Sequence, residues 1–308
     1  MRNTQWVRAL VWAVSIAVVA AFAAGCAVST KTHVKPGEAP APLQNATKEQ
    51  LVEKYNRVAQ EVQSLNASVA MKLTAGTAYT GVIEQYHEVK GFVLAQKPAN
   101  IRVIGQAPVV GKNIFDMVSD GETFHIFIPS KNKFLVGEAH VERPSAKPIE
   151  SLRPQHLLDA LFWQPVPEGA PVLFEEANEA TSHSYVLTIV RPASAAGTMT
   201  TSTAASGDWE IALKVWFDRA DLNISRMETF GGGGRVNSDV RYRDWQASGE
   251  ASYPRQITLT RPGNDYQLAI GISKLALNET IAADRFVLEQ PPGTELVRVG
   301  EESKGTQP

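Results

Sequence analysis

The residue best placed to undergo chemistry is Cys26, the single cysteine of this 308-residue chain. It follows the small-residue run Ala23–Gly25, which ends an apolar stretch that begins after Arg8. A basic start, an apolar core and a small-residue end are typical of a secretory signal. A cysteine at the cleavage point adds a thiol that can accept a diacylglycerol group. Residues 1–25 are therefore predicted to be a lipoprotein signal peptide, and Cys26 is the predicted lipidation site.

The alternative is an uncleaved membrane anchor, because the apolar stretch is close to the shortest that spans a bilayer, about 17 residues. If Cys26 carries lipid, including a fatty acid such as palmitate, no free thiol remains and no disulfide can form. Ala27 follows the cysteine, where some Gram-negative bacteria use aspartate to retain lipoproteins at the inner membrane. We therefore expect a lipid-anchored envelope protein at the outer membrane, facing the periplasm.

Other reactive side chains lack the spacing of a catalytic or metal site. The sequence contains no Gly-x-Ser-x-Gly elbow, phosphate loop or dinucleotide fingerprint. Its six histidines do not share metal-ligand spacing on a helix. Acidic pairs such as Asp218 and Asp221 fit tight turns. The sequence predicts a protein that is not an enzyme and that holds no metal ion or cofactor.

The overall charge gives no reason to expect a nucleic-acid partner. The chain has 30 basic and 32 acidic residues, and its formal net charge is −2. A mildly negative balance gives no reason to expect binding to nucleic acid, or a polybasic patch on this chain that would bind a membrane surface. The expected membrane partner is reached through the N-terminal lipid, and the sequence names no protein partner.

Composition divides the chain into a tether, one domain and a tail. Residues 26–46 contain Pro36, Pro40 and Pro42 without apolar periodicity, which predicts a flexible tether after the lipidated cysteine. Residues 47–299 have no internal linker and are predicted to form a single domain. Residues 300–308 are small, charged and predicted to be disordered.

An amphipathic helix is predicted at the start of this domain. Thr47 and Gln50 match a capping box. Five apolar residues then follow at spacings of three and four, so they fall on one helical face: Leu51, Tyr55, Val58, Val62 and Leu65. We expect this helix to cover a sheet.

The rest of the domain alternates between apolar and polar residues with the period of β-strands. Turn signals such as Lys97–Asn100, Ser119–Gly121 and Pro129–Asn132 separate the expected strands. The later expected strands include Trp209–Phe217, Val236–Trp245 and Phe286–Leu288, with Gly231–Gly234 as a hairpin turn. Residues 192–208 read as a long loop. The pattern predicts an antiparallel β domain of about a dozen strands, folded as a barrel, a half-barrel or a sandwich.

A second helix is predicted in the middle of the chain. Pro154 suits a first helical position, and Pro165 and Pro167 would end the helix that follows. We expect this helix to lie across the sheet as a plug or lid over an apolar cavity. Its candidate cavity-facing residues are Leu157, Leu158, Leu161 and Phe162, and the candidate strand residues opposite are Val103, Phe115, Met117, Phe124 and Ile126.

Several segments, in this order, resemble the LolA/LolB-like lipoprotein-carrier superfamily. They are Leu65–Val69 after the first helix, Gly91–Leu94 with Lys97–Arg102, Ser119–Pro129 with Asn132–Phe134, and Leu277–Asn278 with Phe286–Leu288 and Pro291–Leu296. The resemblance spans roughly residues 48–299. It implies an open β-barrel with helices over its concave face and a cavity for the acyl chains of lipoproteins.

Three functional hypotheses follow. The first is a binding module that holds acyl chains or another apolar ligand in a half-barrel cavity. The alternative is a non-catalytic scaffold or subunit of an envelope assembly, with the same fold and a filled core. The third is a lipid-active hydrolase, which would need a Ser-His-acid cluster in a cleft. Cavity volume discriminates between the first two, because ligand pockets usually have about 300–1,000 Å³.

Overall fold

The computed structural model describes residues 42–76, 83–107, 111–139, 153–179, 182–193, 209–249 and 251–299. Its α-helices are α2 (Lys48–Glu61) and α3 (Pro154–Leu161). Its strands are β1 (Ser64–Ala75), β2 (Glu84–Gln85), β3 (Val89–Gln96), β4 (Asn100–Gln106), β5 (Asn113–Ser119), β6 (Thr123–Ile128), β7 (Lys133–Glu138), β8 (Val172–Asn178), β9 (His183–Pro192), β10 (Trp209–Asp218), β11 (Ile224–Phe230), β12 (Val236–Ser248), β13 (Ala251–Arg261), β14 (Tyr266–Leu277) and β15 (Glu295–Arg298).

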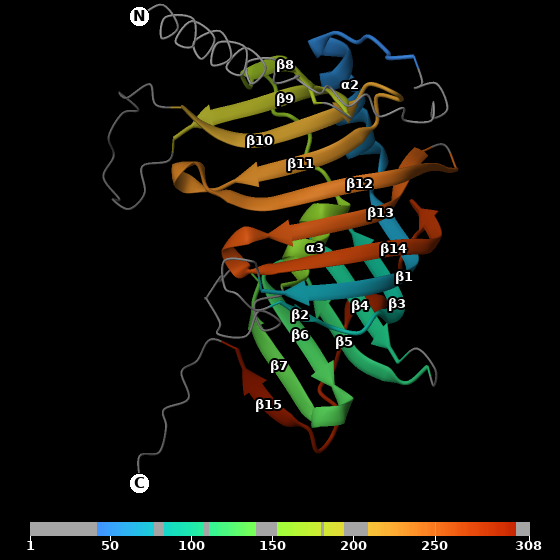
Figure 1. The fold of residues 1–308 in the computed structure, drawn as a ribbon. Coiled ribbons are helices and arrows are strands. Elements are labelled where there is room, and N and C mark those ends of the chain that lie inside the picture. The colour runs from blue at the N-terminus through green and yellow to red at the C-terminus, as the bar shows by residue number, and fades with distance from the viewer. Residues whose placement is uncertain are drawn as a thin grey trace, which may run out of the picture. The chain divides into compact units, whose positions relative to one another are not determined.

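All the strands belong to one open sheet made of two antiparallel meanders (Figure 1). One meander runs from β3 to β7 and the other from β8 to β14. β1 joins them, because it pairs with β3 on one side and with β14 on the other. The path ends at β8 and β15, so the described sheet is not closed. The predicted open antiparallel sheet is confirmed, with 15 strands instead of about a dozen.

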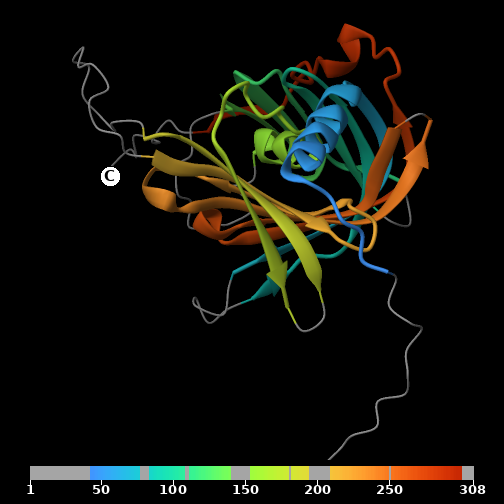
Figure 2. The same cartoon turned by 90° about the horizontal axis from the view of Figure 1, so that it is seen from above.

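Both helices lie on the same side of the curved sheet (Figure 2). α2 contacts β9 and β13, and α3 contacts β4, β5 and β13. The side chains that meet the helices alternate along each strand, as Val69, Met71 and Leu73 do in β1, where they are buried. Helices and inner face therefore share one hydrophobic core, since neither an exposed sheet face nor an isolated helix could bury its apolar residues alone.

The predicted capping box at the start of α2 is confirmed. The Gln50 amide donates to Thr47 Oγ1 at 3.3 Å, and the Thr47 amide donates to Gln50 Oε1 at 2.9 Å. The helical pattern extended the helix too far, however. α2 ends at Glu61, Val62 is its C-cap, and Leu65 lies in β1. Val62 and Leu65 are buried, but strand geometry places Leu65 in the core, because pairing with β3 and β14 begins at this point.

The C-terminal segment differs from the strand predicted at Phe286–Leu288. The chain forms a 3-10 helix at Ala283–Phe286 and then runs across the outer face of the sheet without pairing to it as a strand. Arg102 donates to the Arg285 carbonyl at 2.9 Å, and His125 Nδ1 lies 3.3 Å from the Leu288 carbonyl oxygen. Backbone pairing resumes only in β15, which runs parallel to β7. Side-chain bonds from the outer face hold this segment, so apolar periodicity alone misassigned it.

The two predicted long connections have different outcomes. Gly231–Arg235 link β11 to the antiparallel β12, which confirms the predicted hairpin turn. Of the predicted loop 192–208, Pro192 ends β9, whereas residues 194–208 lie outside the described residues. The predicted tail 300–308 also lies outside them.

The end of α3 is fixed by buried hydroxyl groups from the sheet. Tyr242 Oη donates to the Ala160 carbonyl at 3.1 Å, and Tyr253 Oη donates to the Leu161 carbonyl at 2.7 Å. Trp163 Nε1 in turn donates to Tyr242 Oη at 2.9 Å. Burial raises the pKa of both tyrosines, so their hydroxyl groups stay protonated and able to donate. These bonds satisfy carbonyl groups that the end of a helix otherwise leaves without partners.

The junction between α2 and β1 is held by Asn278, which follows β14. Its Oδ1 accepts from the Gln63 amide at 2.8 Å, and its Nδ2 donates to the Glu61 carbonyl at 2.7 Å. Asn278 has a φ of 59°, a left-handed conformation that asparagine tolerates better than most residues. One side chain thus closes the end of α2 and links it to the start of the C-terminal segment.

Replacing Tyr253 with phenylalanine should lower the free energy of unfolding by about 1–3 kcal/mol, because the buried Leu161 carbonyl loses its donor. Urea denaturation monitored by circular dichroism measures this change. Tyr266→Phe is unsuitable as a control, since Tyr266 Oη lies 2.7 Å from His156 Nδ1. Tyr86→Phe is suitable, because Tyr86 is only half-buried. An equal loss in both variants would contradict the anchoring role of Tyr253.

Replacing Asn278 with alanine should cost about 2–4 kcal/mol, from the loss of its side-chain hydrogen bonds and from a left-handed backbone that alanine adopts poorly. Asn278→Gly removes the same bonds but relieves the backbone, so it should recover about 1 kcal/mol of that loss. Denaturation of the two variants side by side separates the contributions. If both variants are as stable as the unmodified protein, the Asn278 side chain does not hold the junction between α2 and β1.

Candidate functional site

The predicted cavity residues from the strands share the inner face beneath α3. Val103 pairs with Met117 across β4 and β5, and Met117 pairs with Ile126 across β5 and β6. Gly105 pairs with Phe115, and Ser119 pairs with Phe124, in the same alternation. Because directly paired residues face the same way, the strand orientation inferred from the period is the orientation observed.

The two aromatic members of this set occupy the space above glycines in neighbouring strands. A Cβ atom on Gly105 would lie 2.3 Å from Phe115 Cε1, and one on Gly137 would lie 2.7 Å from Phe124 Cε1. The rings therefore lie over the glycine backbone. Arg153, just before α3, lies with its guanidinium carbon 5.3 Å from the centroid of the Phe124 ring. Phe124 therefore contacts both the sheet and the residue that precedes α3.

The predicted face of α3 is packed against this inner face. Leu157, Leu158, Leu161 and Phe162 are buried, and they share one core cluster with Val103 and Met117. Phe115 and Ile126 are half-buried against that cluster. None of the predicted cavity residues lines either of the two grooves that flank α2. A ligand cavity beneath α3 therefore stays a prediction.

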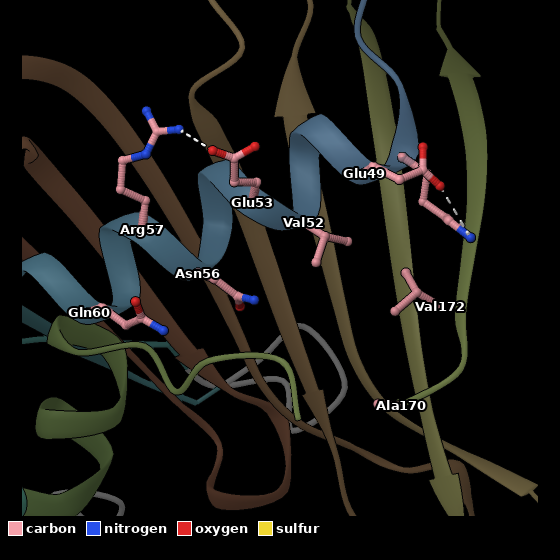
Figure 3. A pocket seen from close by; sticks show the side chains of 9 residues that line it. Glu49, Val52, Glu53, Asn56, Arg57, Gln60, Ala170 and Val172 are labelled. Atoms are coloured by element: carbon pink, nitrogen blue, oxygen red, sulfur yellow. Dashed lines mark hydrogen bonds and ion pairs between the residues drawn. The ribbon is translucent and has the colours of Figure 1, made fainter. Parts of the chain in front are cut away.

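A groove of about 720 Å³ opens instead along one side of α2 (Figure 3). We call it the α2 groove. Its apolar wall is formed by Val52 on the helix and by Ala170 and Val172 at the start of β8. Its polar rim comes from α2: Lys48, Glu49, Glu53, Asn56, Arg57 and Gln60. The volume lies within the usual range of ligand pockets, about 300–1,000 Å³.

The charges at this rim neutralise one another. Lys48 Nζ lies 3.7 Å from a Glu49 oxygen, and Arg57 donates to Glu53 at 2.9 Å, one helical turn away (Figure 3). Both pairs are largely exposed, so each contributes little to stability. Lined by two cations and two anions, the groove has no net charge that would select an ionic ligand.

Asn56 holds the chain segment that leads to the groove wall opposite α2. Its Oδ1 accepts from the Val166 amide at 2.8 Å, in the proline-rich segment that leads from α3 to β8. Pro165 and Pro167 flank that amide, and neither has an N–H group of its own to donate. Asn56 is therefore the side chain that ties this segment to α2.

A second groove of about 530 Å³ runs along the other side of α2. Val58 and Lys54 line it from the helix, and Leu222 and Trp245 line it from the sheet side. Lys54 Nζ donates to Asn223 Oδ1 at 3.3 Å, and burial lowers the pKa of Lys54. α2 is thus flanked by open space on both sides, whereas α3 is enclosed.

Lys97 connects the ends of the two helices. Its Nζ donates to the Ala59 carbonyl near the end of α2 and lies 5.5 Å from the centroid of the Phe162 ring. Burial lowers the pKa of Lys97. A cation at a helix C-terminus interacts favourably with the free carbonyl groups there.

Sequence reasoning missed the α2 groove, although a signal for it was available. Val52 is apolar but lies outside the predicted stripe of Leu51, Tyr55 and Val58, so it marks a second apolar side of α2. The residues that complete the wall, Ala170 and Val172, are more than 100 positions away in the sequence. Only the fold brings them to α2.

The predicted lipidation site, Cys26, lies outside the described residues. Within the described ranges, no helix combines the length and the apolar composition required to cross a membrane. The same ranges contain no group of three or more histidine, cysteine, aspartate or glutamate side chains arranged to hold a metal ion.

No protein-family model and no curated protein matches the chain. Its fold is similar to solved structures of low sequence identity. They include a LolA superfamily protein from Nitrosomonas europaea (12% identity, 79% of this chain and 99% of that chain, TM-score 0.46). Others are a DUF1329 family protein from Desulfovibrio piger (14%, 77% and 94%, 0.47) and a putative outer membrane lipoprotein-sorting protein domain from Vibrio parahaemolyticus (8%, 77% and 94%, 0.45).

Proposed function

We propose that this chain is a non-catalytic binding protein of the bacterial envelope, and that it holds an acyl chain or a similar apolar ligand beside α2. The observation that carries this proposal is the α2 groove, which has ligand-sized volume and an apolar wall of Val52, Ala170 and Val172. Burial of each methylene group of a ligand contributes about 0.8 kcal/mol. A few methylene groups along this wall would therefore give useful affinity.

The position of the groove also supports a ligand that enters from solvent. It lies between a helix and the segment before an edge strand, so opening it disrupts no pair of strands. The helix beside it has space on its other side as well. α2 could therefore shift to admit a ligand, whereas the hydroxyl groups of Tyr242 and Tyr253 hold α3 in place.

A second candidate function is the tethered scaffold with a filled core. The packing beneath α3 favours it, because the buried Trp163 stacks on Trp245 at 5.9 Å between ring centroids and also contacts the rings of Tyr242 and Tyr253. Closely packed side chains of this kind leave few voids larger than a water molecule. In that case the α2 groove would be a surface depression without a ligand.

A titration distinguishes the two functions. The soluble domain beginning after Cys26 should bind a fluorescent fatty acid and a lipopeptide saturably. Val52→Glu should weaken binding at least about tenfold, because it removes apolar wall and places a charge against the ligand.

Val58→Glu is the matched control, since Val58 is also half-buried on α2 but lines the opposite groove. It should leave binding unchanged if the ligand occupies the α2 groove. A greater effect of Val58→Glu would move the ligand to the other side of α2, and absence of binding by the folded domain would favour the scaffold.

We also propose that Cys26 carries the lipid anchor, at the outer membrane and facing the periplasm. Metabolic labelling with an alkynyl fatty acid should mark the unmodified protein and not the Cys26→Ala variant, because the thiol is the acceptor. Label on the variant would contradict lipidation at this residue. Membrane fractionation that finds the protein only in the inner membrane would contradict the location.

A further inference from the structure

The strand β8 ends the sheet and leaves one backbone edge without a neighbour among the described residues. Its sequence, Val-Leu-Phe-Glu-Glu-Ala-Asn, contains no proline or lysine to discourage further pairing. Leu173 is 63% exposed on one face and Phe174 is 39% exposed on the other. The opposite end of the sheet, β15, has only four residues. β8 is therefore the longer and more apolar of the two edges.

Leu173 lies on the outer face of the sheet, where its direct neighbour in β9 is Thr188 and apolar residues of β9 and β10 lie further along the same face. Val190 in β9 pairs with Ile211 in β10, and Trp209 pairs with Pro192 one step further along. Trp209 is 55% exposed, and Val190 and Ile211 are half-buried. This outer patch faces away from the core, because Val190 alternates with the buried core residue Ile189. Exposed apolar patches of this kind often mark interaction sites.

The second half of β8 is acidic. Glu175 shares the outer face with Leu173, because these residues pair with Val186 and Thr188 in β9. Glu176 faces the other way, where Arg219 Nη1 lies 3.2 Å from its carboxylate. Glu175 is exposed and has no such basic partner among the described residues. An incoming strand therefore meets apolar side chains along the first half of β8 and uncompensated negative charge along the second.

We propose that β8 is a docking edge for an extended segment of a partner protein, which adds to the sheet as an antiparallel strand. The segment is basic where it faces Glu175 and apolar where it faces Leu173. Backbone hydrogen bonds supply affinity in this mode of recognition, and side chains at alternate positions supply specificity. The inference is independent of the α2 groove, because Leu173 and Glu175 lie on the opposite face of β8 from Phe174 and Val172.

Two other occupants fit the edge less well. A second copy of this chain, paired antiparallel about Glu175, would place two glutamates opposite each other. A shift of the centre to Phe174 would place Leu173 opposite Glu175. A membrane surface could accept Leu173 and Trp209, but hydrocarbon cannot satisfy the free N–H and C=O groups of a strand edge.

The test uses a fluorescent peptide of the same length as β8, Thr-Lys-Thr-Lys-Val-Val-Ile, and the full mature chain as cells produce it. Fluorescence anisotropy should show saturable binding of this peptide. A peptide with both lysines replaced by glutamate should bind about three- to tenfold more weakly, as expected from cross-strand charge pairs. A backbone N-methylated peptide should not bind.

Variants of β8 assign the site. Glu175→Lys should reverse the preference between the two peptides, which a change in folding would not do. Leu173→Asn should weaken binding of the lysine peptide about three- to fivefold, from loss of one apolar cross-strand contact. Leu296→Asn is the matched control, because Leu296 is an exposed leucine in the other edge strand, and it should have no effect.

Other results would contradict the addition of a partner strand at β8. Equal binding of all three peptides, or no saturable binding by a folded protein, would exclude strand addition at β8. Loss of binding to anionic phospholipid vesicles in the Leu173→Asn variant, without any peptide binding, would assign the outer patch to the membrane. Concentration-dependent dimerisation abolished by Glu175→Lys or Leu173→Asn would assign the edge to a second copy.

Discussion

The hydrogen bonds from Tyr242 and Tyr253 to the last turn of α3 stabilise the connection between the two meanders of the sheet. The chain leaves the first meander at β7, next to one edge of the sheet, and enters the second at β8, the opposite edge. The connection contains α3, which packs on the inner face against β4, β5 and β13. A helix that ends inside the core exposes carbonyl groups to an apolar environment, which is costly unless donors reach them. The two tyrosines, one from β12 and one from β13, supply those donors.

This arrangement separates a fixed helix from a less constrained one. α3 is buried on nearly every side. Trp163, just beyond its end, stacks on Trp245 and contacts the ring of Tyr242. α2 buries Leu51, Tyr55 and Ala59 but leaves grooves along both flanks. Its C-terminal end is held by polar contacts of Lys97 and Asn278 with its last carbonyl groups. If the protein binds an apolar ligand, α2 is the element that the packing allows to move, because fewer buried contacts must break.

The two ends of the sheet differ in how their outer faces are covered. Near β15 the C-terminal segment crosses the outer face and is bonded to it through Arg102, whose guanidinium group also makes a bidentate pair with Asp116 at 2.8 and 3.0 Å. Val118 pairs with Arg102 and His125, the two residues that bond to this segment, and it is buried although it lies on the outer face. β8 has no comparable cover among the described residues, and its exposed side chains include the apolar Leu173 and Phe174 and the acidic Glu175.

The sequence by itself determined the local features, because they depend on neighbours along the chain. The capping box of Thr47 and Gln50, the helix start at Pro154, the glycine turn before β12 and the facing of Val103, Met117 and Ile126 all follow from short-range geometry. The lipidation of Cys26 follows from the same kind of local pattern and stays a prediction, since that residue lies outside the described part of the chain. The sequence also identified a mainly antiparallel sheet, because period-two segments separated by short turns have few other solutions. That the sheet is open was implied by the family resemblance and not by the period.

Only the tertiary structure decided the features that depend on distant residues. The position of β1 between β3 and β14, the parallel pairing of β15 and the transfer of Leu65 from helix to strand are set by partners far away in the sequence. The α2 groove also depends on distant residues, because Val172 comes to lie beside α2 only after the chain has crossed the sheet through α3. Periodicity records which face of an element is apolar, but it contains no information about which other element will cover that face or leave it open.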